Sequence, residues 1–170
     1  IIVGTSAGSV VGALYAAGLD GFRIQELSMN MEEDQVIDGS GMYRCIAETV
    51  VSDKRGCIKG EALQDFINKN VKHRPIERLN KTFAAVATNL SNGEMMVFQT
   101  GNTGMAVRAS SSVPVFFQPV TVNAKDYVDG GLVTPVPVSV ARTLGADFVI
   151  AVDISDRPQD RTTAGIVDIL

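Results

Sequence analysis

The feature that most constrains the fold is a short turn at the start of the chain, where an apolar run passes through Gly-Thr-Ser-Ala-Gly into a helical pattern. Residues 1–3 predict a short buried strand, and residues 10–17 predict a helix that ends at Gly18. The turn between them, residues 4–8, is so short that the chain must change direction sharply. A strand that passes directly into a helix is typical of proteins in which helices cover a sheet.

The rest of the chain alternates between helix and strand signals. A helix is expected over residues 20–29, where an aspartate can cap its start, and an amphipathic helix over residues 61–69. Two strand-like runs flank Ser-Asn-Gly at residues 91–93, which predicts a β-hairpin. A second hairpin is expected over residues 120–131, and the apolar run at residues 147–154 predicts a strand buried on both faces of a sheet. Further expected elements are helices at residues 42–51, 105–110 and 137–144 and a loop at residues 32–41. Because strands and helices interleave, the predicted class is α/β with a mixed sheet.

Length and composition agree with a globular domain. Of the 170 residues, 45% are hydrophobic and 20% are charged, which is ordinary for a protein with a packed core. The net charge of −4 gives no sign of a nucleic-acid partner, and no apolar run is long enough to cross a bilayer. Cys45 and Cys57 do not form a Cys-x-x-Cys pair, so two reduced thiols are expected rather than a disulfide.

Both ends of the chain are expected to be cut within a larger domain. Residue 1 already lies inside the first predicted strand. The pattern of residues 162–170 predicts the start of a helix with no cap or stop signal. We therefore expect a single domain over residues 1–170 that is truncated at its N-terminus and at its C-terminus. A signal sequence upstream of residue 1 stays open.

Ser6 stands at the centre of a Gly-x-Ser-x-Gly motif between a strand and a helix, which is the setting of a nucleophilic serine. Side chains at Gly4 and Gly8 are expected to collide with the neighbouring strand and helix, so that glycine is needed at both positions. The turn would present the Ser6 hydroxyl at the carboxyl end of the strand, with the Ala7 N–H placed to stabilise an oxyanion. Two alternatives stay open. One is a tight turn that only lets the helix pack closely, and the other is a phosphate-binding loop, although the Gly-Lys-Ser/Thr ending of a P-loop and the Gly-x-Gly start of a dinucleotide site are missing.

A serine hydroxyl is a weak nucleophile and needs a base. His73 is the only histidine, but it lies in a basic polar stretch and precedes the aspartates that could orient it, against the usual order of serine, aspartate and histidine. The basic stretch is interpreted as a solvated face, with contact to anionic lipid as the alternative. A carboxylate that acts directly is therefore favoured. Asp129, before two glycines, is the first candidate, and Asp153, at the end of an apolar run, is its rival.

Five segments follow one another from residue 1 nearly to residue 170: GTSAGS after the first strand, FAAVATNLSNGE, AVRASSSVPVFFQPV, YVDGGLVTPVPVSVARTLGAD and VIAVDIS. Together they resemble the patatin-like phospholipase family, most of all its compact bacterial members. The resemblance implies a three-layer α/β fold, in which a central mixed, mostly parallel sheet carries helices on both faces. It also implies a Ser–Asp dyad without histidine, with Ser6 as the nucleophile and Asp129 as the general base. The motif glycines carried over with this dyad are Gly4, Gly8, Gly130 and Gly131.

The reaction implied by the resemblance is hydrolysis of lipid acyl esters through an acyl-Ser6 intermediate, with Asp129 as the base in both steps. The family's main oxyanion loop is Gly-rich and precedes the nucleophile strand, and this chain begins after it. Only the Ala7 N–H is then expected as an oxyanion donor here. Loss of a single such donor costs on the order of 10²–10³ in rate, so the isolated chain is expected to be weakly active or inactive.

Phe116 and Phe117 lie in an apolar, proline-broken loop that the resemblance places near the active site. Core packing is the favoured role for both rings. A role in an acyl-chain pocket or at a membrane surface is the alternative.

We therefore expect a serine lipid acyl hydrolase of the phospholipase A or lysophospholipase type. The alternatives are a general carboxylesterase or thioesterase, a non-catalytic lipid-binding or regulatory relative, and a nucleotide-binding α/β module. The expected partners are a lipid or acyl-ester substrate and a membrane surface, with no nucleic acid, no metal and no other cofactor. The expected location is the cytoplasm or the membrane periphery of a bacterium, while the oligomeric state and the headgroup preference stay open.

Overall fold

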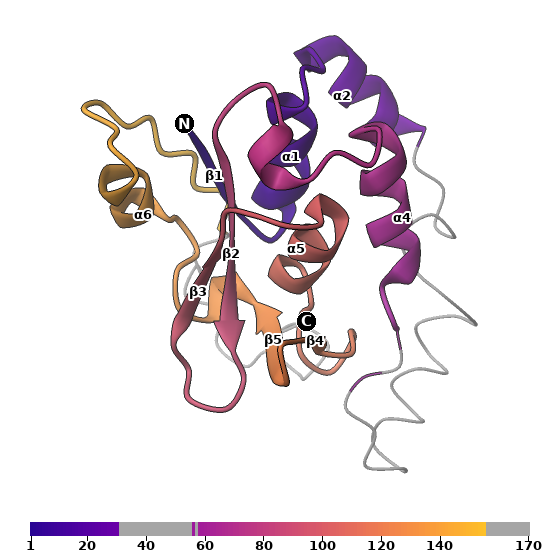
Figure 1. Cartoon of the computed structure of the whole chain (residues 1–170), viewed down its shortest axis with the longest axis vertical. Coiled ribbons are helices and arrows are strands. Elements are labelled where there is room, and N and C mark those ends of the chain that lie inside the picture. Colours follow the sequence, from indigo (N-terminus) through magenta and orange to yellow (C-terminus); the bar gives the residue numbers. More distant parts are fainter. Residues whose placement is uncertain (31–55, 57, 156–170) are drawn as a thin grey trace, which may run out of the picture.

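The computed structural model describes residues 1–30, 56 and 58–155 of the chain (Figure 1). The strands are β1 (Ile2–Thr5), β2 (Phe83–Asn89), β3 (Met95–Phe98), β4 (Val120–Val122) and β5 (Lys125–Asp129). The helices are α1 (Ala7–Ala16), α2 (Gly21–Met29), α4 (Glu61–Asn70), α5 (Thr103–Ser110) and α6 (Val138–Thr143). Two short 3-10 helices are η2 (Ile76–Arg78) and η3 (Gly130–Leu132). The predicted loop at 32–41, the predicted helices at 42–51 and 162–170, and both cysteines lie outside the described residues.

Local signals in the sequence explain where several of these elements begin and turn. The Asp20 carboxylate accepts the Arg23 N–H at 2.8 Å at the start of α2, which confirms the predicted cap. The β2–β3 hairpin turns with Gly93 at φ +71°, as the Asn-Gly signal predicts. The β4–β5 hairpin turns through Asn123 and Ala124, whose φ values of 50° and 61° are both positive. Helix α1 begins earlier than expected, because the turn passes into it without a connecting loop.

Strand β2 is the centre of a five-stranded sheet, and every one of its residues is buried. β1 runs parallel to it along residues 83–86, β3 runs antiparallel along residues 85–88, and β5 runs antiparallel along residues 87–89. β3 therefore shares two β2 residues with β1 and two others with β5. A strand has only two edges, so β1 and β5 must both lie on the edge opposite β3.

β1 and β5 consequently meet end to end along one edge of β2. Thr5, the last residue of β1, lies opposite Val86, and Asp129, the last residue of β5, lies opposite Ala87. The two strands run toward each other, because one is parallel and the other antiparallel to β2. Whatever follows Thr5 in the chain is therefore brought to the end of β5.

Helices lie on both sides of this sheet (Figure 1). α1 and α5 pack against one side, α4 packs on α5, and α6 lies on the other side beside β1. Gly12 lets α1 come close to the sheet, because a Cβ there would stand only 3.1 Å from atoms of Ile2 and Phe83. The predicted α/β class, mixed sheet and two-sided helix cover are confirmed. Among the described strands, however, β1–β2 is the one parallel pairing and three pairings are antiparallel, since two hairpins contribute most of the strands.

The apolar run at residues 147–154 forms no strand, and the prediction of a buried strand there is wrong. Phe148 and Ile150 each keep 80% of their surface exposed, and Val152 and Ile154 keep 76% and 77%. A strand is stable only where a neighbouring backbone takes its hydrogen bonds, and no described strand pairs with this segment. The apolar pattern shows that the side chains of this segment are hydrophobic. It does not show that a neighbouring strand is present to pair with the segment.

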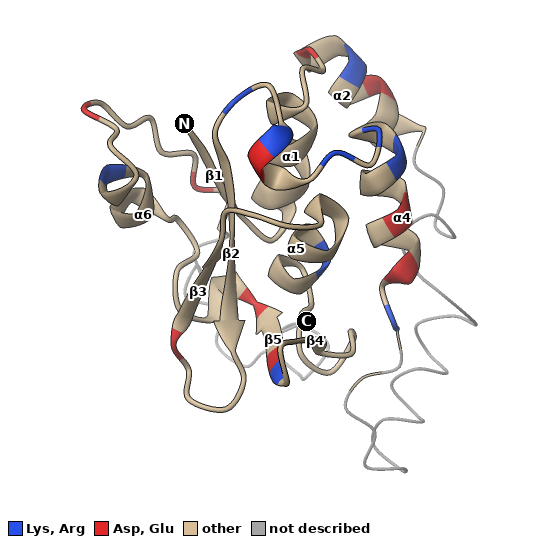
Figure 2. Ribbon diagram, viewed as in Figure 1, with Lys and Arg blue, Asp and Glu red and all other residues tan. Residues whose placement is uncertain are grey.

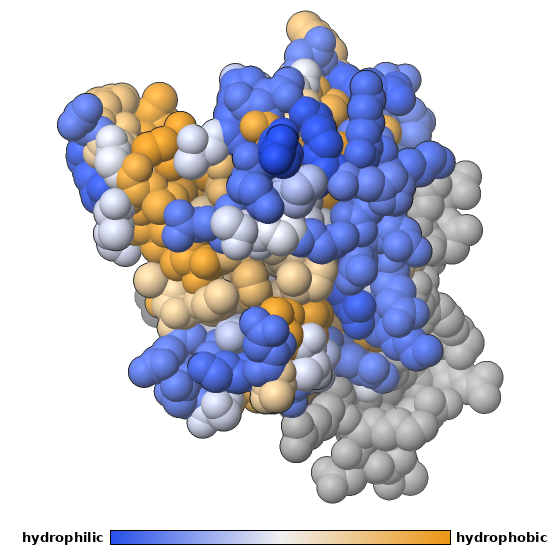
Figure 3. Space-filling model, viewed as in Figure 1, coloured by the Kyte–Doolittle hydropathy of each residue, from blue (hydrophilic) through white to orange (hydrophobic). Residues whose placement is uncertain are grey.

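The surface differs from one side of the molecule to the other. Figure 2 shows acidic and basic residues mixed along α2, α4 and the loops beside them. Figure 3 shows a hydrophilic surface over α2 and α4 and an apolar surface around α6. Within the described ranges, no helix is long and apolar enough to cross a membrane.

Candidate active site

The turn between β1 and α1 holds Ser6 in a strained backbone conformation. Its φ of 53° and ψ of −126° lie in a region that residues with a side chain rarely adopt and that costs on the order of 1–3 kcal/mol. Ser6 is the N-cap of α1, and its carbonyl accepts the Ser9 N–H at 2.8 Å and the Ser9 hydroxyl at 2.7 Å. The sharp turn predicted from the sequence is present, and hydrogen bonds hold its helical end.

The two glycines of the turn have different surroundings. A Cβ on Gly4 would lie 2.4 Å from the Gly8 carbonyl oxygen and 2.5 Å from Ser9 Cα, distances that no side chain tolerates. A Cβ on Gly8 would meet no described atom within 4 Å. The steric expectation is therefore confirmed at Gly4 and wrong at Gly8, because Gly8 lies on the exposed side of α1.

The Ser6 hydroxyl donates a hydrogen bond to Asp129 Oδ2 at 2.6 Å. The two residues are 123 positions apart in the sequence. They meet because β1 and β5 end against each other on the same edge of β2. The distance is typical of a hydroxyl that donates to a carboxylate.

Hydrogen bonds hold both the side chain and the backbone of Asp129. Its second carboxylate oxygen, Oδ1, accepts the Gly131 N–H at 2.7 Å. Its backbone N–H donates to the Ser112 carbonyl at 2.9 Å, and its own carbonyl accepts the Thr88 hydroxyl at 2.8 Å. The side chain is buried, with 6% of the residue exposed. These bonds leave the carboxylate one orientation, in which Oδ2 faces Ser6.

Gly130 lets the chain pass close to β2 directly after Asp129. A Cβ on Gly130 would lie 2.2 Å from the Val86 carbonyl oxygen, so only glycine fits there. This is the close backbone approach that the Asp-Gly-Gly sequence predicts. A Cβ on Gly131 would meet the Asp129 carboxylate at 3.0 Å.

The backbone N–H groups at the N-terminal end of α1 differ in their partners. The Ser9 and Val10 N–H groups both reach the Ser6 carbonyl. Among the described residues, no acceptor takes the N–H of Ala7, the residue after Ser6. An N–H at a helix N-terminus favours a negatively charged oxygen. The site therefore combines a hydroxyl, a carboxylate that accepts its proton, and a nearby N–H donor.

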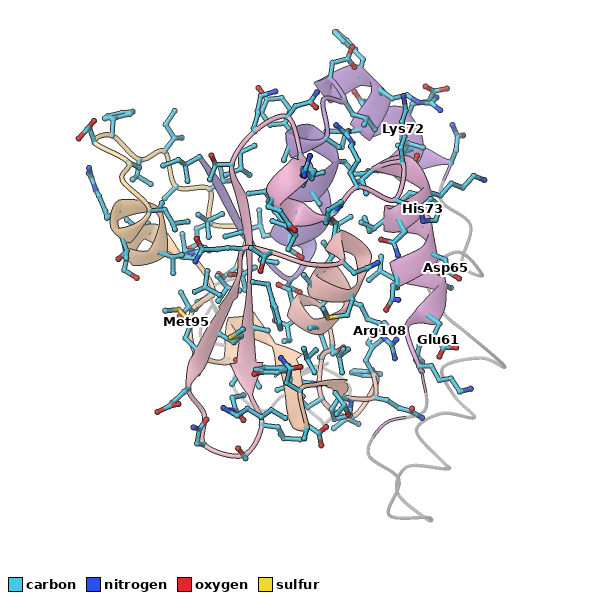
Figure 4. All side chains as sticks on the ribbon, in the orientation of Figure 1. Glu61, Asp65, Lys72, His73, Met95 and Arg108 are labelled. Carbon is cyan, nitrogen blue, oxygen red and sulfur yellow. The ribbon has the colours of Figure 1, made fainter. Side chains whose placement is uncertain are left out.

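The two other candidate bases lie elsewhere. His73 is exposed and lies beyond the end of α4. Its backbone N–H donates to the Asn68 carbonyl at 2.6 Å. Figure 4 shows His73 on the α4 side of the molecule, across from Met95. Asp153 is exposed and accepts the hydroxyl and N–H of Ser155, which together lower the pKa of its carboxyl. Neither side chain has a hydrogen bond to Ser6 among those described.

The loop with Phe116 and Phe117 is tied to another part of the chain. The Phe116 carbonyl accepts the Ile58 N–H at 3.0 Å, and the Ile58 carbonyl accepts the Gln118 N–H at 2.8 Å. The Phe117 ring lies beside Gly60, where an added Cβ would stand 3.3 Å from it. Both rings are half-buried. Neither ring is part of the buried core or among the partly buried side chains packed against it, so the core-packing role stays a prediction.

Sequence reasoning missed Ser110, which contacts the backbone of the turn at Ser6. The Ser6 N–H donates to Ser110 Oγ at 2.9 Å. Ser110 is the last residue of α5 and is fully buried. The only signal in the sequence is a run of three serines at the end of a predicted helix, which does not say where their hydroxyls point.

This chain is similar to known proteins over most of its length. The patatin-like phospholipase model matches residues 1–142. The chain is 31% identical over 155 residues to an uncharacterized NTE family protein of Mycobacterium tuberculosis, covering 91% of this chain and 40% of that protein. It is 30% identical over 166 residues to patatin-like phospholipase domain-containing protein 7 of Rattus norvegicus, covering 96% of this chain and 12% of that protein. It is 28% identical over 170 residues to lysophospholipase NTE1 of Meyerozyma guilliermondii, covering 100% of this chain and 11% of that protein.

The chain thus spans less than half the length of the curated relatives it matches. The family model nevertheless includes β1, the turn at Ser6, β2 and the Asp-Gly-Gly segment. This chain belongs to the patatin-like phospholipase family.

Proposed function

We propose that this chain carries the active site of a serine lipid acyl hydrolase, with Ser6 as the nucleophile and Asp129 as the general base. The observation that carries the proposal is the 2.6 Å hydrogen bond from the Ser6 hydroxyl to Asp129 Oδ2. A nucleophile and its base within hydrogen-bond distance, with the base oriented by a third group, is the arrangement that covalent catalysis needs. Here the third group is the Gly131 N–H on Oδ1.

In the first step, Ser6 Oγ attacks the carbonyl carbon of the ester while its proton passes to Asp129 Oδ2. The carbonyl oxygen becomes an oxyanion, and the Ala7 N–H at the start of α1 is placed to stabilise it. The bond from the carbonyl carbon to the alcohol oxygen then breaks. The alcohol leaves with the proton from Asp129, and the acyl group stays on Ser6 Oγ.

In the second step, Asp129 takes a proton from a water molecule as the water oxygen attacks the acyl carbon. A second tetrahedral intermediate forms, and its bond to Ser6 Oγ breaks. The proton returns to Ser6, and a fatty acid is released. One carboxylate thus serves both steps without histidine, which accounts for the position of His73 away from the site.

Lipid substrates are favoured by two observations. The family description names phospholipases, and one relative is named a lysophospholipase. In addition, apolar side chains are exposed directly beyond the residues that hold the dyad. Leu132 is 60% exposed in η3, and Val113, which follows Ser112, is 39% exposed. An acyl chain can be covered by such side chains, whereas a polar substrate gains nothing from them.

The test is release of fatty acid by the intact protein from phospholipid, from lysophospholipid and from a short-chain ester. Ser6→Ala should abolish release, and Asp129→Asn should reduce kcat by about 10²–10⁴, the usual contribution of a general base. Asp126→Asn is the matched control, because Asp126 lies on the same strand and accepts the Thr121 hydroxyl instead. Release from the short-chain ester alone would favour a general carboxylesterase, and full activity in Asp129→Asn would overturn the dyad.

A further inference from the structure

The hydroxyl of Ser110 joins the nucleophile turn to the sheet. The Ser6 N–H donates to Ser110 Oγ at 2.9 Å. Ser110 Oγ in turn donates to the Val86 carbonyl oxygen at 2.6 Å. The residue is fully buried at the end of α5. Its hydroxyl therefore bridges the backbones of two segments to which Ser110 does not itself belong.

The direction of both hydrogen bonds is fixed by chemistry. A serine hydroxyl has one proton and two lone pairs. The Val86 carbonyl can only accept, so it takes the proton, and the Ser6 N–H can only donate, so it uses a lone pair. Removal of the hydroxyl would take this partner from the Ser6 N–H and from the buried Val86 carbonyl at once.

The hydrogen bond to Ser110 holds Ser6, the residue of the turn whose backbone is strained. As the N-cap of α1, Ser6 has an N–H with no partner inside the helix. Ser9 fixes the carbonyl side of Ser6, and Ser110 fixes its N–H side. With both sides held, the positive φ of Ser6 is fixed, and so is the direction of the bond from Cα to Cβ.

The carbonyl at the far end of the bridge also lies beside Asp129. Val86 is the β2 residue next to Ala87, which pairs with Asp129. Gly130 packs against the same Val86 carbonyl, where an added Cβ would stand at 2.2 Å. Ser110 thus ties the nucleophile to the stretch of backbone that supports the base.

We propose that Ser110 is a positioning residue, whose hydroxyl keeps Ser6 Oγ within hydrogen-bond distance of Asp129 Oδ2. The proposal rests on the proposed function, since it takes Ser6 as the nucleophile. A displacement of about 1 Å of a reacting group can cost on the order of 10²-fold in rate. We expect Ser110→Ala to lower kcat by about 10- to 100-fold, with little change in KM, because the hydroxyl does not touch the substrate.

The test measures how fast a fluorophosphonate modifies Ser6 in the intact protein, and what fraction of the protein is modified at the end. The variants are Ser110→Ala, Ser110→Thr, which restores a hydroxyl, and Thr103→Val as the matched control. Thr103 is also fully buried, and at the other end of α5 its hydroxyl donates to the Arg74 carbonyl at 2.7 Å. Thr103→Val therefore removes a side-chain hydrogen bond of similar length at the end of α5 opposite to the contact with Ser6.

Positioning predicts that Ser110→Ala reacts about 10- to 100-fold more slowly but reaches the same final fraction. Thr103→Val should react at close to the wild-type rate, and Ser110→Thr should recover much of the lost rate. An unchanged rate with a smaller final fraction would mean that Ser110 only supports folding, and it would overturn the proposal. Equal rates in Ser110→Ala and Thr103→Val would overturn it as well. Absence of label on Ser6 in the wild type would instead overturn the proposed function, and this proposal with it.

Discussion

The glycines on either side of Ser6 are alike in the sequence but differ in what they contact. Gly4 lies against the first turn of α1, with no space for a Cβ, whereas Gly8 faces open space on the same helix. The motif therefore combines a glycine that the packing requires with one that it does not.

We expect Gly4→Ala and Gly8→Ala to have opposite effects on stability. Gly4→Ala should lower the free energy of unfolding by about 1–3 kcal/mol, the usual cost of overpacking. Gly8→Ala should leave it unchanged or raise it by up to about 1 kcal/mol, because alanine is the better residue within a helix. Urea unfolding of the two variants beside the wild type measures both. Equal destabilisation would show that Gly8 is also sterically required.

At the scale of the element, both hairpins turn through residues with positive φ, but the residue types differ. The β2–β3 turn has Gly93 at φ +71°, and the β4–β5 turn has Ala124 at φ 61°. An L-residue with a Cβ is disfavoured there by roughly 1–2 kcal/mol, and glycine is not. The hairpin that ends in Asp129 thus carries the less favourable turn.

We expect Ala124→Gly to raise the free energy of unfolding by up to about 1 kcal/mol, because it relieves the left-handed alanine. Gly93→Ala should lower it by a similar amount. No described atom lies within 4 Å of a Cβ at Gly93, so the effect there is conformational alone. Thermal unfolding of both variants is the measurement. A destabilised Ala124→Gly would contradict the turn geometry.

Glu77 joins two elements and makes their contact sensitive to pH. Its carboxylate accepts the Gly101 N–H at 2.9 Å, so it links η2 to the loop before α5. Hydrogen bonds from the backbone N–H groups of Glu77 and Gly101 are the main causes that lower the pKa of this carboxyl. A lowered pKa in the folded state means that the ionised carboxylate stabilises the fold above its unfolded pKa.

Glu77→Gln should therefore be less stable than the wild type near neutral pH. The difference should persist down to about pH 4.3, the ordinary pKa of glutamate, and disappear as the pH falls through the lower folded value. Urea unfolding of both proteins over this range measures the difference in free energy. A difference that does not change with pH would mean that the charge of Glu77 has no part in the contact.

At the scale of the whole molecule, single helices, strands and turns could be predicted from the sequence. The contacts between distant segments could not. The Asp20 cap and the Asn-Gly hairpin depend on neighbouring residues, and the structure has both. The contact between Ser6 and Asp129 depends instead on β1 and β5 sharing one edge of β2, which no local pattern contains. From the residues alone, Asp129 is the first candidate base for Ser6 with Asp153 as its rival, and the resemblance to a family favours Asp129.

Two further features could not be predicted from the sequence, because they too depend on contacts between distant segments. The role of Ser110 depends on burial and on two backbone partners from distant segments. The strand expected at residues 147–154 depends on a partner strand, and none of the described strands pairs with it. Hydrophobic patterns and short motifs describe one segment at a time, whereas hydrogen bonds between segments decide both cases.

The measurement that tests the central claim most directly is fluorophosphonate labelling of the intact protein, with the modified residue located by mass spectrometry. Wild type, Ser6→Ala, Asp129→Asn and Asp126→Asn are compared, each first shown to be folded. A Ser6–Asp129 dyad predicts that the label lies on Ser6, is lost in Ser6→Ala, and forms about 10²–10⁴ more slowly in Asp129→Asn. Asp126→Asn should react like the wild type. A folded wild type that carries no label on Ser6, or an Asp129→Asn variant labelled as fast as the wild type, would contradict the dyad.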